Sequence, residues 1–198
     1  MIQLSPNKLS YITRSIPNML WFLKWLIIKR SLKKVGKNFK FGFNSEFIDH
    51  RLIEVGDNVF MGQRTVINTN VSVKIGNNVM FGPQVTIMGG DHNISVVGQP
   101  MRFVKTGGKN IPIIIEDDVW VGTNVTILKG ITIGEGSVIG AGSVVTRSLP
   151  PYSVCIGNPC KAVKLRFNED DLETHLKEVR SNYSKKRVVE LFNSSATK

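Results

Sequence analysis

The sequence is poor in cysteine, with two residues, Cys155 and Cys160, among 198. Two cysteines in a chain of this length do not build a disulfide framework, and neither has metal-binding spacing around it. The shortage therefore argues against a disulfide-stapled secreted scaffold. It predicts two reduced thiols in a cytoplasmic protein.

The sequence also lacks an apolar run long enough to cross a membrane. Residues 16–28 are strongly apolar, but a spanning helix needs about 20 apolar residues. A basic cluster follows this segment and no small-residue cleavage site is present, so it does not resemble a cleaved signal peptide.

Acidic residues are missing from the first 40 positions. These positions hold nine Lys and Arg residues, whereas residues 41–160 hold eight basic and nine acidic residues. Most of the net charge of +11 therefore belongs to an N-terminal arm. A nucleic-acid-binding protein gathers basic and aromatic residues on its folded surface, so this distribution argues against nucleic acid as a partner.

What the sequence does contain is a six-residue repeat. Between residues 115 and 149 a β-branched aliphatic residue recurs every six positions, and glycine follows it at Gly122, Gly134 and Gly140. A helix repeats near 3.6 residues and a strand near 2, so a period of six indicates a short strand plus a sharp corner. Breaks in the register follow the third hexad of a set, which predicts three strands per turn and loops that leave at one corner.

The repeat sets the domain plan. Weaker hexads extend it back to Val35, which predicts an all-β-dominated coil of about five turns over residues 35–166. A helical arm precedes it at residues 1–34, and a helical tail follows at 167–198. In the tail, Asn168 has the character of a helix N-cap, and His175 is expected to face solvent.

Two compatible interpretations of the arm stay open. In the first, its helix packs an apolar face onto the open end of the coil. In the second, Trp21, Trp25 and the basic residues up to position 34 hold the helix against anionic lipid at the inner face of the cell membrane. The second interpretation adds peripheral membrane contact to a cytoplasmic location.

Residues 88–112 form the one long loop. A regular coil has no structural need for such an insertion, and long loops on rigid scaffolds often carry function. Its strong chemical group is His92, because histidine exchanges protons near neutral pH. Asp91 is a candidate to orient the imidazole or contact substrate, with a solvated carboxylate as the alternative. Arg102 and Lys105 are candidates to bind an acidic glycan.

The hexads and the segment that follows them resemble the hexapeptide-repeat acyltransferases. After the last hexad come Pro150-Pro151 and then Gly157-Asn158-Pro159-Cys160-Lys161, which is similar to the exit segment of that family. The resemblance covers residues 35–166 and implies a left-handed parallel β-helix. It also implies a homotrimer with active sites between chains, and acetyl-CoA as co-substrate without a metal.

The resemblance further implies individual site residues. The family places its catalytic histidine where this chain has His92. It implies that Thr123 lines the pantetheine, that Ala141 and Thr146 contact CoA, and that Lys161 and Lys164 meet the CoA phosphates. Corner packing for Thr123 and Ala141, and a solvated surface for the lysines, are the alternatives.

Trp120 departs from the small or aliphatic residue typical of its position. We expect an exposed ring, which either floors a sugar pocket beside His92 of a neighbouring subunit or packs at a trimer interface. Arg102 is a second candidate substrate contact, from the long loop.

Direct transfer is the expected chemistry. His92 takes the proton of an acceptor hydroxyl, which attacks the acetyl carbonyl, and then gives the proton to the departing thiolate. An acetyl-cysteine route is disfavoured, since Cys155 and Cys160 have no neighbouring base in the sequence. The Gly-Gly-Asp-His-Asn loop most resembles enzymes that O-acetylate sugars of bacterial surface polysaccharides.

Two alternatives remain open. In the first, the acceptor is a small molecule, namely a nucleotide-linked amino sugar, a free sugar or an antibiotic. In the second, the coil is a non-catalytic scaffold that does not bind acetyl-CoA. A γ-type carbonic anhydrase is disfavoured, because it needs three histidines on one metal, whereas His50, His92 and His175 lie in separate segments.

Overall fold

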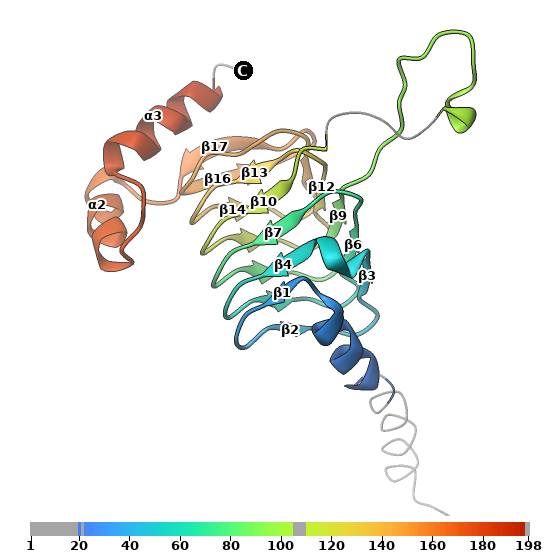
Figure 1. The fold of residues 1–198 in the computed structure, drawn as a ribbon. Coiled ribbons are helices and arrows are strands. Elements are labelled where there is room, and N and C mark those ends of the chain that lie inside the picture. Colours follow the sequence, from blue (N-terminus) through green and yellow to red (C-terminus); the bar gives the residue numbers. More distant parts are fainter. Residues whose placement is uncertain (1–19, 21, 105–109, 197–198) are drawn as a thin grey trace, which may run out of the picture.

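Short strands and sharp corners wind the chain into a parallel β-solenoid with three strands per turn (Figure 1). The fold is described from a computed structural model, which covers residue 20 and residues 22–104 and 110–196. The predicted parallel β-helix is thereby confirmed, with an N-terminal helix at one end and two helices at the other.

The strands form three parallel sheets, one on each side of the solenoid. The first sheet holds β1 (Lys34–Val35), β4 (Ile53–Val55), β7 (Val73–Ile75), β10 (Ile113–Ile115) and β13 (Thr132–Ile133). The second holds β2 (Lys40–Phe41), β5 (Phe60–Met61), β8 (Met80–Phe81), β11 (Trp120–Val121), β14 (Val138–Ile139), β16 (Ser153–Ile156) and the antiparallel β17 (Lys161–Leu165). The third holds β3 (Glu46–Ile48), β6 (Val66–Asn68), β9 (Thr86–Met88), β12 (Thr126–Ile127) and β15 (Val144–Val145).

The solenoid has about six turns, one more than the sequence predicts. A bridge between Ile133 and Leu149 opens the sixth turn, and β16 continues it beside β14. The hexad count missed this turn because its sequence leaves the register at Pro150-Pro151.

The hexad residues fill the interior. On the third sheet Ile67, Ile87, Ile127 and Val145 stack in one register, and all four are fully buried. Each such aliphatic side chain stabilises the fold by about 1.5–3 kcal/mol relative to an exposed one. A six-residue period therefore places one buried branched residue on each side of each turn.

Two corners of each turn are built from residues that tolerate unusual backbone geometry. Between the first and second sheets, Asn38, Asn58 and Asn78 have φ near +57°, at 58, 56 and 58°. Asparagine adopts this left-handed region more readily than most residues. Their side chains form a ladder, with Asn38 Nδ2 donating to Asn58 Oδ1 at 2.9 Å and Asn58 Nδ2 to Asn78 Oδ1 at 3.1 Å. We call this edge the asparagine corner.

In the first five turns, each connection between the second and third sheets begins with glycine, and we call this edge the glycine corner. At Gly62 a Cβ would lie 2.5 Å from both the carbonyl carbon of Gly82 and the nitrogen of Pro83. These are backbone atoms of the next turn, so the neighbouring chain has no flexible side chain to move aside. Glycine is required at Gly62 by the close stacking of turns.

The N-terminal helix closes the first turn. Residues 22–31 are helical, and Ile28 and Leu32 are buried against the core with Trp25 partly buried beside them. This is the packing expected in the first interpretation of the arm, while Trp21 lies outside the described residues. His50 was expected to be exposed, but it is half-buried and its Nδ1 lies 2.5 Å from Ser31 Oγ. In the described part of the chain, no helix has the length and hydropathy to cross a bilayer.

The C-terminal tail folds back on the solenoid as α2 (Glu169–Glu178) and α3 (Lys185–Ala196). Asn168 caps α2 as predicted, because its Oδ1 accepts the backbone N–H of Asp171 at 2.9 Å. Leu172, Leu176 and Val188 pack with Tyr152 in a second small core. The tail helices and the long loop lie on opposite sides of the solenoid (Figure 1).

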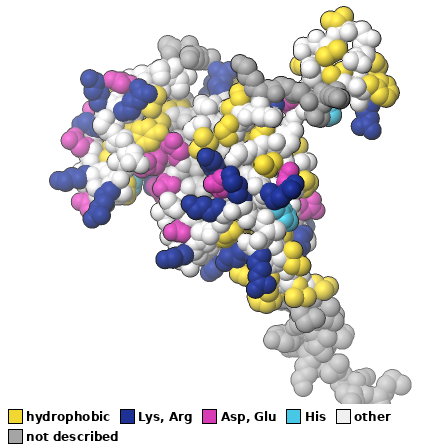
Figure 2. Space-filling view, in the orientation of Figure 1, with side chains coloured by type: hydrophobic (Ala, Val, Ile, Leu, Met, Phe, Trp, Pro, Cys, Tyr) yellow, Lys and Arg dark blue, Asp and Glu magenta, His cyan; other side chains and the backbone are white. Residues whose placement is uncertain are grey.

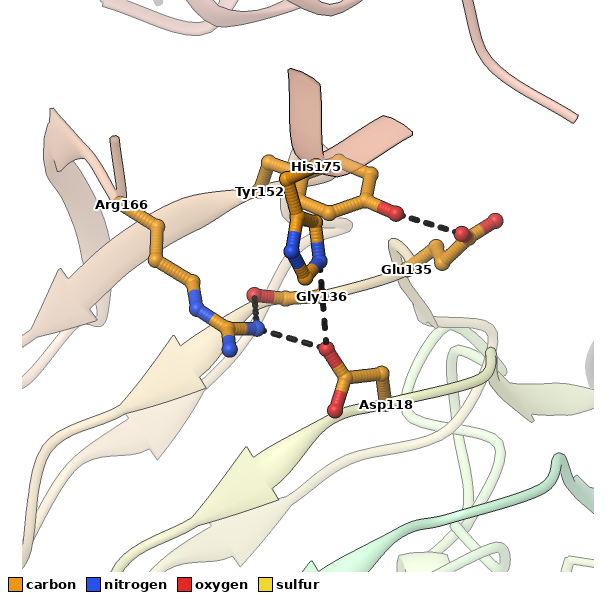
Figure 3. Close-up of polar contacts among 6 residues, drawn as sticks. All are labelled: Asp118, Glu135, Gly136, Tyr152, Arg166 and His175. Carbon is orange, nitrogen blue, oxygen red and sulfur yellow. Dashed lines mark hydrogen bonds and ion pairs between the residues drawn. The ribbon is translucent and has the colours of Figure 1, made fainter. Parts of the chain in front are cut away.

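His175 was expected to face solvent, and that expectation is wrong. Its ring packs between Tyr152 and Phe167. Its Nε2 points toward Asp118 (Figure 3) and lies 4.0 Å from Asp118 Oδ2. Asp118 occupies the asparagine-corner position of its turn, with φ of 55°. Arg166 donates to Asp118 Oδ2 at 2.7 Å. An acid at this corner therefore pairs with Arg166 and lies against His175, so it helps to dock the tail on the solenoid.

Candidate functional site

The long loop leaves the solenoid where the third sheet ends. We call this edge the exit corner, formed by the residues that follow each strand of the third sheet. The loop runs from Met88 to Ile113 and projects from the solenoid as the green segment of Figure 1, with residues 105–109 outside the description. Beyond its base it exposes Ile94, Val97 and Phe103, at 79, 97 and 77%. Exposed apolar side chains of this size indicate a surface that contacts another molecule.

His92 lies at the base of this loop with an exposed side chain. It forms no hydrogen bond or ion pair with the part of the chain that the structure describes. Its imidazole is therefore open to an incoming hydroxyl, which is what a general base requires.

Asp91 has a partner other than His92. Its Oδ2 lies 2.6 Å from Lys129 Nζ, and the Lys129 side chain is 17% exposed. Lys129 follows β12, which pairs with β9 so that Ile127 lies opposite Ile87. This ion pair ties the loop base to the next turn. Sequence reasoning missed Lys129, although the hexad register already places it beside the loop base.

Three of the predicted CoA residues, Thr123, Ala141 and Thr146, lie along the two edges of the third sheet. Thr123 and Ala141 occupy adjacent turns of the glycine corner, where a Cβ on Gly122 would lie 2.7 Å from Ala141 N. Thr123 Oγ1 donates to the carbonyl oxygen of Pro83 at 2.9 Å. Thr146 follows β15 and is exposed at the exit corner, the same edge as the loop base. The structure thus brings Thr123 and Ala141 together and places Thr146 across the sheet from them.

A small cleft lies where the exit corner meets the tail. It has a volume of about 140 Å³, and Arg147, Cys160, Lys161 and Ser195 are among the residues that line it. Lys161 therefore lies in the same cleft as Arg147, the residue after Thr146. Lys164 is exposed elsewhere on β17. Two cations in one cleft suit a phosphate group. Sequence reasoning missed Arg147. Its position directly after Thr146, a predicted CoA contact, could have indicated it as a further phosphate-binding candidate.

Trp120 is exposed as predicted, with 52% of its surface accessible. It projects from the outer face of the second sheet, in register with Met80 and, one turn further, Phe60. Those two side chains are 50 and 51% exposed, so the three form an apolar ladder. The ladder and His92 belong to different sides of one chain. Arg102 lies far out on the loop, in a short helical turn at Met101–Phe103, and is exposed.

The cysteines and histidines limit the chemistry further. Cys155 and Cys160 are fully buried, and burial raises the pKa of the Cys155 thiol to about 12 and also raises the pKa of Cys160. Neither thiol is placed to accept an acetyl group. The three histidines lie beside the arm, at the loop base and under the tail, and no cluster of three metal-binding side chains occurs among the described residues.

Comparison with known proteins gives the family. Residues 52–82 and 112–147 match the family model for the hexapeptide repeat of succinyl-transferase. A probable macrolide acetyltransferase of Lysinibacillus sphaericus is 31% identical over 156 residues, which cover 75% of this chain and 84% of that protein. This chain belongs to the hexapeptide-repeat acetyltransferases.

Other members of the family are named for sugars. The galactoside O-acetyltransferase of Escherichia coli K12 is 33% identical over 73% of this chain, which spans 59% of that relative. A maltose O-acetyltransferase from Clostridium difficile 630 superimposes with a TM-score of 0.64 at 37% identity, covering 70% of this chain and 72% of that one. A galactoside acetyltransferase in complex with coenzyme A gives a TM-score of 0.64 at 34% identity, covering 73% of this chain and 70% of that one.

Proposed function

We propose that this acetyltransferase transfers the acetyl group of acetyl-CoA to a sugar hydroxyl, on a bacterial surface polysaccharide or its precursor. The observation that carries the proposal is an open imidazole, His92, at the base of the one long loop of a solenoid shared with sugar O-acetyltransferases. A cytoplasmic location, where acetyl-CoA is available, is part of the proposal.

His92 performs the proton transfers. Its neutral imidazole takes the proton of the acceptor hydroxyl as the oxygen attacks the thioester carbonyl, and the resulting imidazolium returns that proton to the CoA thiolate. No acyl-enzyme intermediate is needed, in keeping with the burial of Cys155 and Cys160.

Acetyl-CoA lies along the edges of the third sheet in this proposal. Thr123 and Ala141 line the pantetheine arm at the glycine corner, and Thr146 contacts CoA at the exit corner. The phosphates meet the cations of the small cleft, Lys161 and Arg147, while Lys164 stands nearer the solvent.

The complete site requires a second chain. Trp120 and His92 occupy different sides of one chain, while both the ladder Phe60–Met80–Trp120 and the loop tip expose apolar surface. A homotrimer with C3 symmetry lets each chain present its ladder to a different surface of its neighbour. In that arrangement Trp120 of one chain and the loop of another, with Arg102, enclose the acceptor sugar.

The molecular mass in solution tests the proposed homotrimer. Light scattering should give about 66 kDa, three times the 22.1 kDa of one chain. Met80→Glu, in the middle of the ladder, should reduce the mass to that of one chain, because it buries a charge at the interface. The control Val179→Glu changes an equally exposed apolar residue, at 49%, in the tail and should remain a trimer. If the Met80→Glu variant is still a trimer, the ladder does not lie at the interface between chains.

A second candidate function has its own support. The macrolide acetyltransferase relative is matched over 84% of its length, which favours a small antibiotic acceptor instead of a polysaccharide. The same donor site and the same base serve either acceptor.

Thiol release from acetyl-CoA decides between the two acceptors. We expect galactosides, maltosides or an acidic polysaccharide to stimulate release, and a macrolide to have no effect. Stimulation by the macrolide alone would establish the second candidate. If the protein neither binds acetyl-CoA nor releases thiol with any acceptor, both candidate functions are wrong. The non-catalytic scaffold is then the remaining interpretation.

A further inference from the structure

The N-terminal helix carries two apolar stripes, and the solenoid uses one of them. Trp25, Ile28 and Leu32 pack into the core at the open end of the first turn. Leu20, Leu23 and Ile27 form the second stripe, and they are 61, 50 and 66% exposed. Residues spaced by three and four share one side of a helix, and at 100° per residue the two stripes face well apart. Capping the solenoid explains the first stripe and leaves the second without a partner among the described residues.

Basic side chains border the exposed stripe. Arg30 is exposed on the same side of the helix as Leu23, and the next turn of chain adds Lys33 and Lys34, both exposed. The first acidic residue of the chain is Glu46, and Lys33 is paired with Glu54 at 2.7 Å. Figure 2 shows apolar and basic side chains gathered at this end of the solenoid. The surface therefore combines exposed apolar area with a net positive charge, although Glu54 offsets part of it.

The positive charge of this surface favours an anionic membrane over a second copy of the chain as its partner. A second copy of the chain, laid stripe against stripe, would bring two acid-free basic segments together and meet like-charge repulsion. An anionic bilayer offers hydrocarbon to the stripe and lipid phosphates to the basic border at the same depth.

We propose that residues 20–34 dock this acetyltransferase onto the surface of an anionic membrane. The helix lies in the plane of the interface with Leu20, Leu23 and Ile27 inserted. The basic border holds lipid phosphates, and the solenoid extends away from the bilayer. Since the long loop leaves from the third turn, its base stands about 10 Å beyond the first turn. The loop is therefore kept clear of the headgroups.

Vesicle co-sedimentation of the full-length chain tests the proposal. We expect binding to vesicles of phosphatidylcholine and phosphatidylglycerol that is at least about 10-fold stronger than binding to phosphatidylcholine alone, and that weakens at about 0.5 M salt. The double variant Leu23→Glu/Ile27→Glu should lose at least about 10-fold in binding, because two carboxylates cannot enter the interface beside anionic lipid. Val179→Glu, an exposed apolar residue at the opposite end, should bind like the wild type.

Two results would overturn the proposal: a wild-type chain that stays in the supernatant with anionic vesicles, or a double variant that binds as well as the wild type. A double variant that changes the oligomeric mass would likewise assign the stripe to a contact between chains. Thermal melting establishes that the variant is folded. Thiol release with a soluble acceptor and no vesicles should match the wild type, so a failed docking test and a failed acetyltransferase assignment give different results.

Discussion

Replacing His92 with alanine should lower kcat for acetyl transfer by about 100-fold or more, the usual effect of losing a general base. The affinity for acetyl-CoA should change little, because the predicted CoA residues lie on the edges of the third sheet and on β17, and not on the loop. The measurement compares kcat and KM for thiol release in wild type and His92→Ala, with acetyl-CoA binding by calorimetry.

The matched control is His50→Ala. His50 also lies at the exit corner, but it is half-buried and hydrogen bonded to Ser31 beside the arm. Its loss should leave kcat within about twofold, since it does not touch the transferred proton. Equal losses in the two variants, or a His92→Ala enzyme with near wild-type turnover, would assign the proton transfer to another group. A His92→Ala enzyme that binds acetyl-CoA much more weakly than the wild type would instead assign His92 to donor binding.

Gly62→Val should lower the free energy of unfolding by about 3 kcal/mol or more. Its Cβ alone would lie 2.5 Å from backbone atoms of Gly82 and Pro83, and overpacking against a rigid neighbour costs most when nothing relaxes. Urea unfolding by circular dichroism, at one protein concentration, measures the change. Gly62→Ala serves if the valine variant does not fold, with an expected loss of about 1–3 kcal/mol.

Gly90→Ala is the control for this effect. An added Cβ at Gly90 would first meet the Asn70 side chain at 3.7 Å, an ordinary contact distance, and φ there does not require glycine. Its free energy of unfolding should therefore stay within about 0.5 kcal/mol of the wild type. If Gly62→Ala unfolds at the same urea concentration as the wild type, the turns at this corner are not stacked as tightly as described.

The features predicted well from the sequence were those that repeat locally. A buried residue every six positions, with a small residue after it, is fixed by the geometry of one strand and one corner. It therefore indicated the solenoid, the single exit corner and the exposure of Trp120. The N-cap at Asn168 was predictable for the same reason, since its partner Asp171 is three residues away.

The features that were missed depend on contacts between distant residues. His175 was expected in solvent because nothing in its own helix reveals Asp118, an acid that stands where the three preceding turns have asparagine. The Asp91–Lys129 ion pair and the pairing of Arg147 with Lys161 in one cleft require adjacent turns to be superimposed. The hexad register predicts which turns lie next to each other, but it does not by itself predict which side chains pair across them.

The three corners of the solenoid differ in how much length they tolerate. At the asparagine and glycine corners each connection spans four residues in the first five turns, such as 36–39, 56–59, 42–45 and 62–65. At the exit corner the connections range from 49–52 to the whole of the long loop. Evolution can therefore lengthen or exchange loops at one edge without disturbing the stacked backbone. Because the proposed function places the acceptor against this loop, we expect that grafting a relative's loop between Met88 and Ile113 changes acceptor specificity and leaves the solenoid intact.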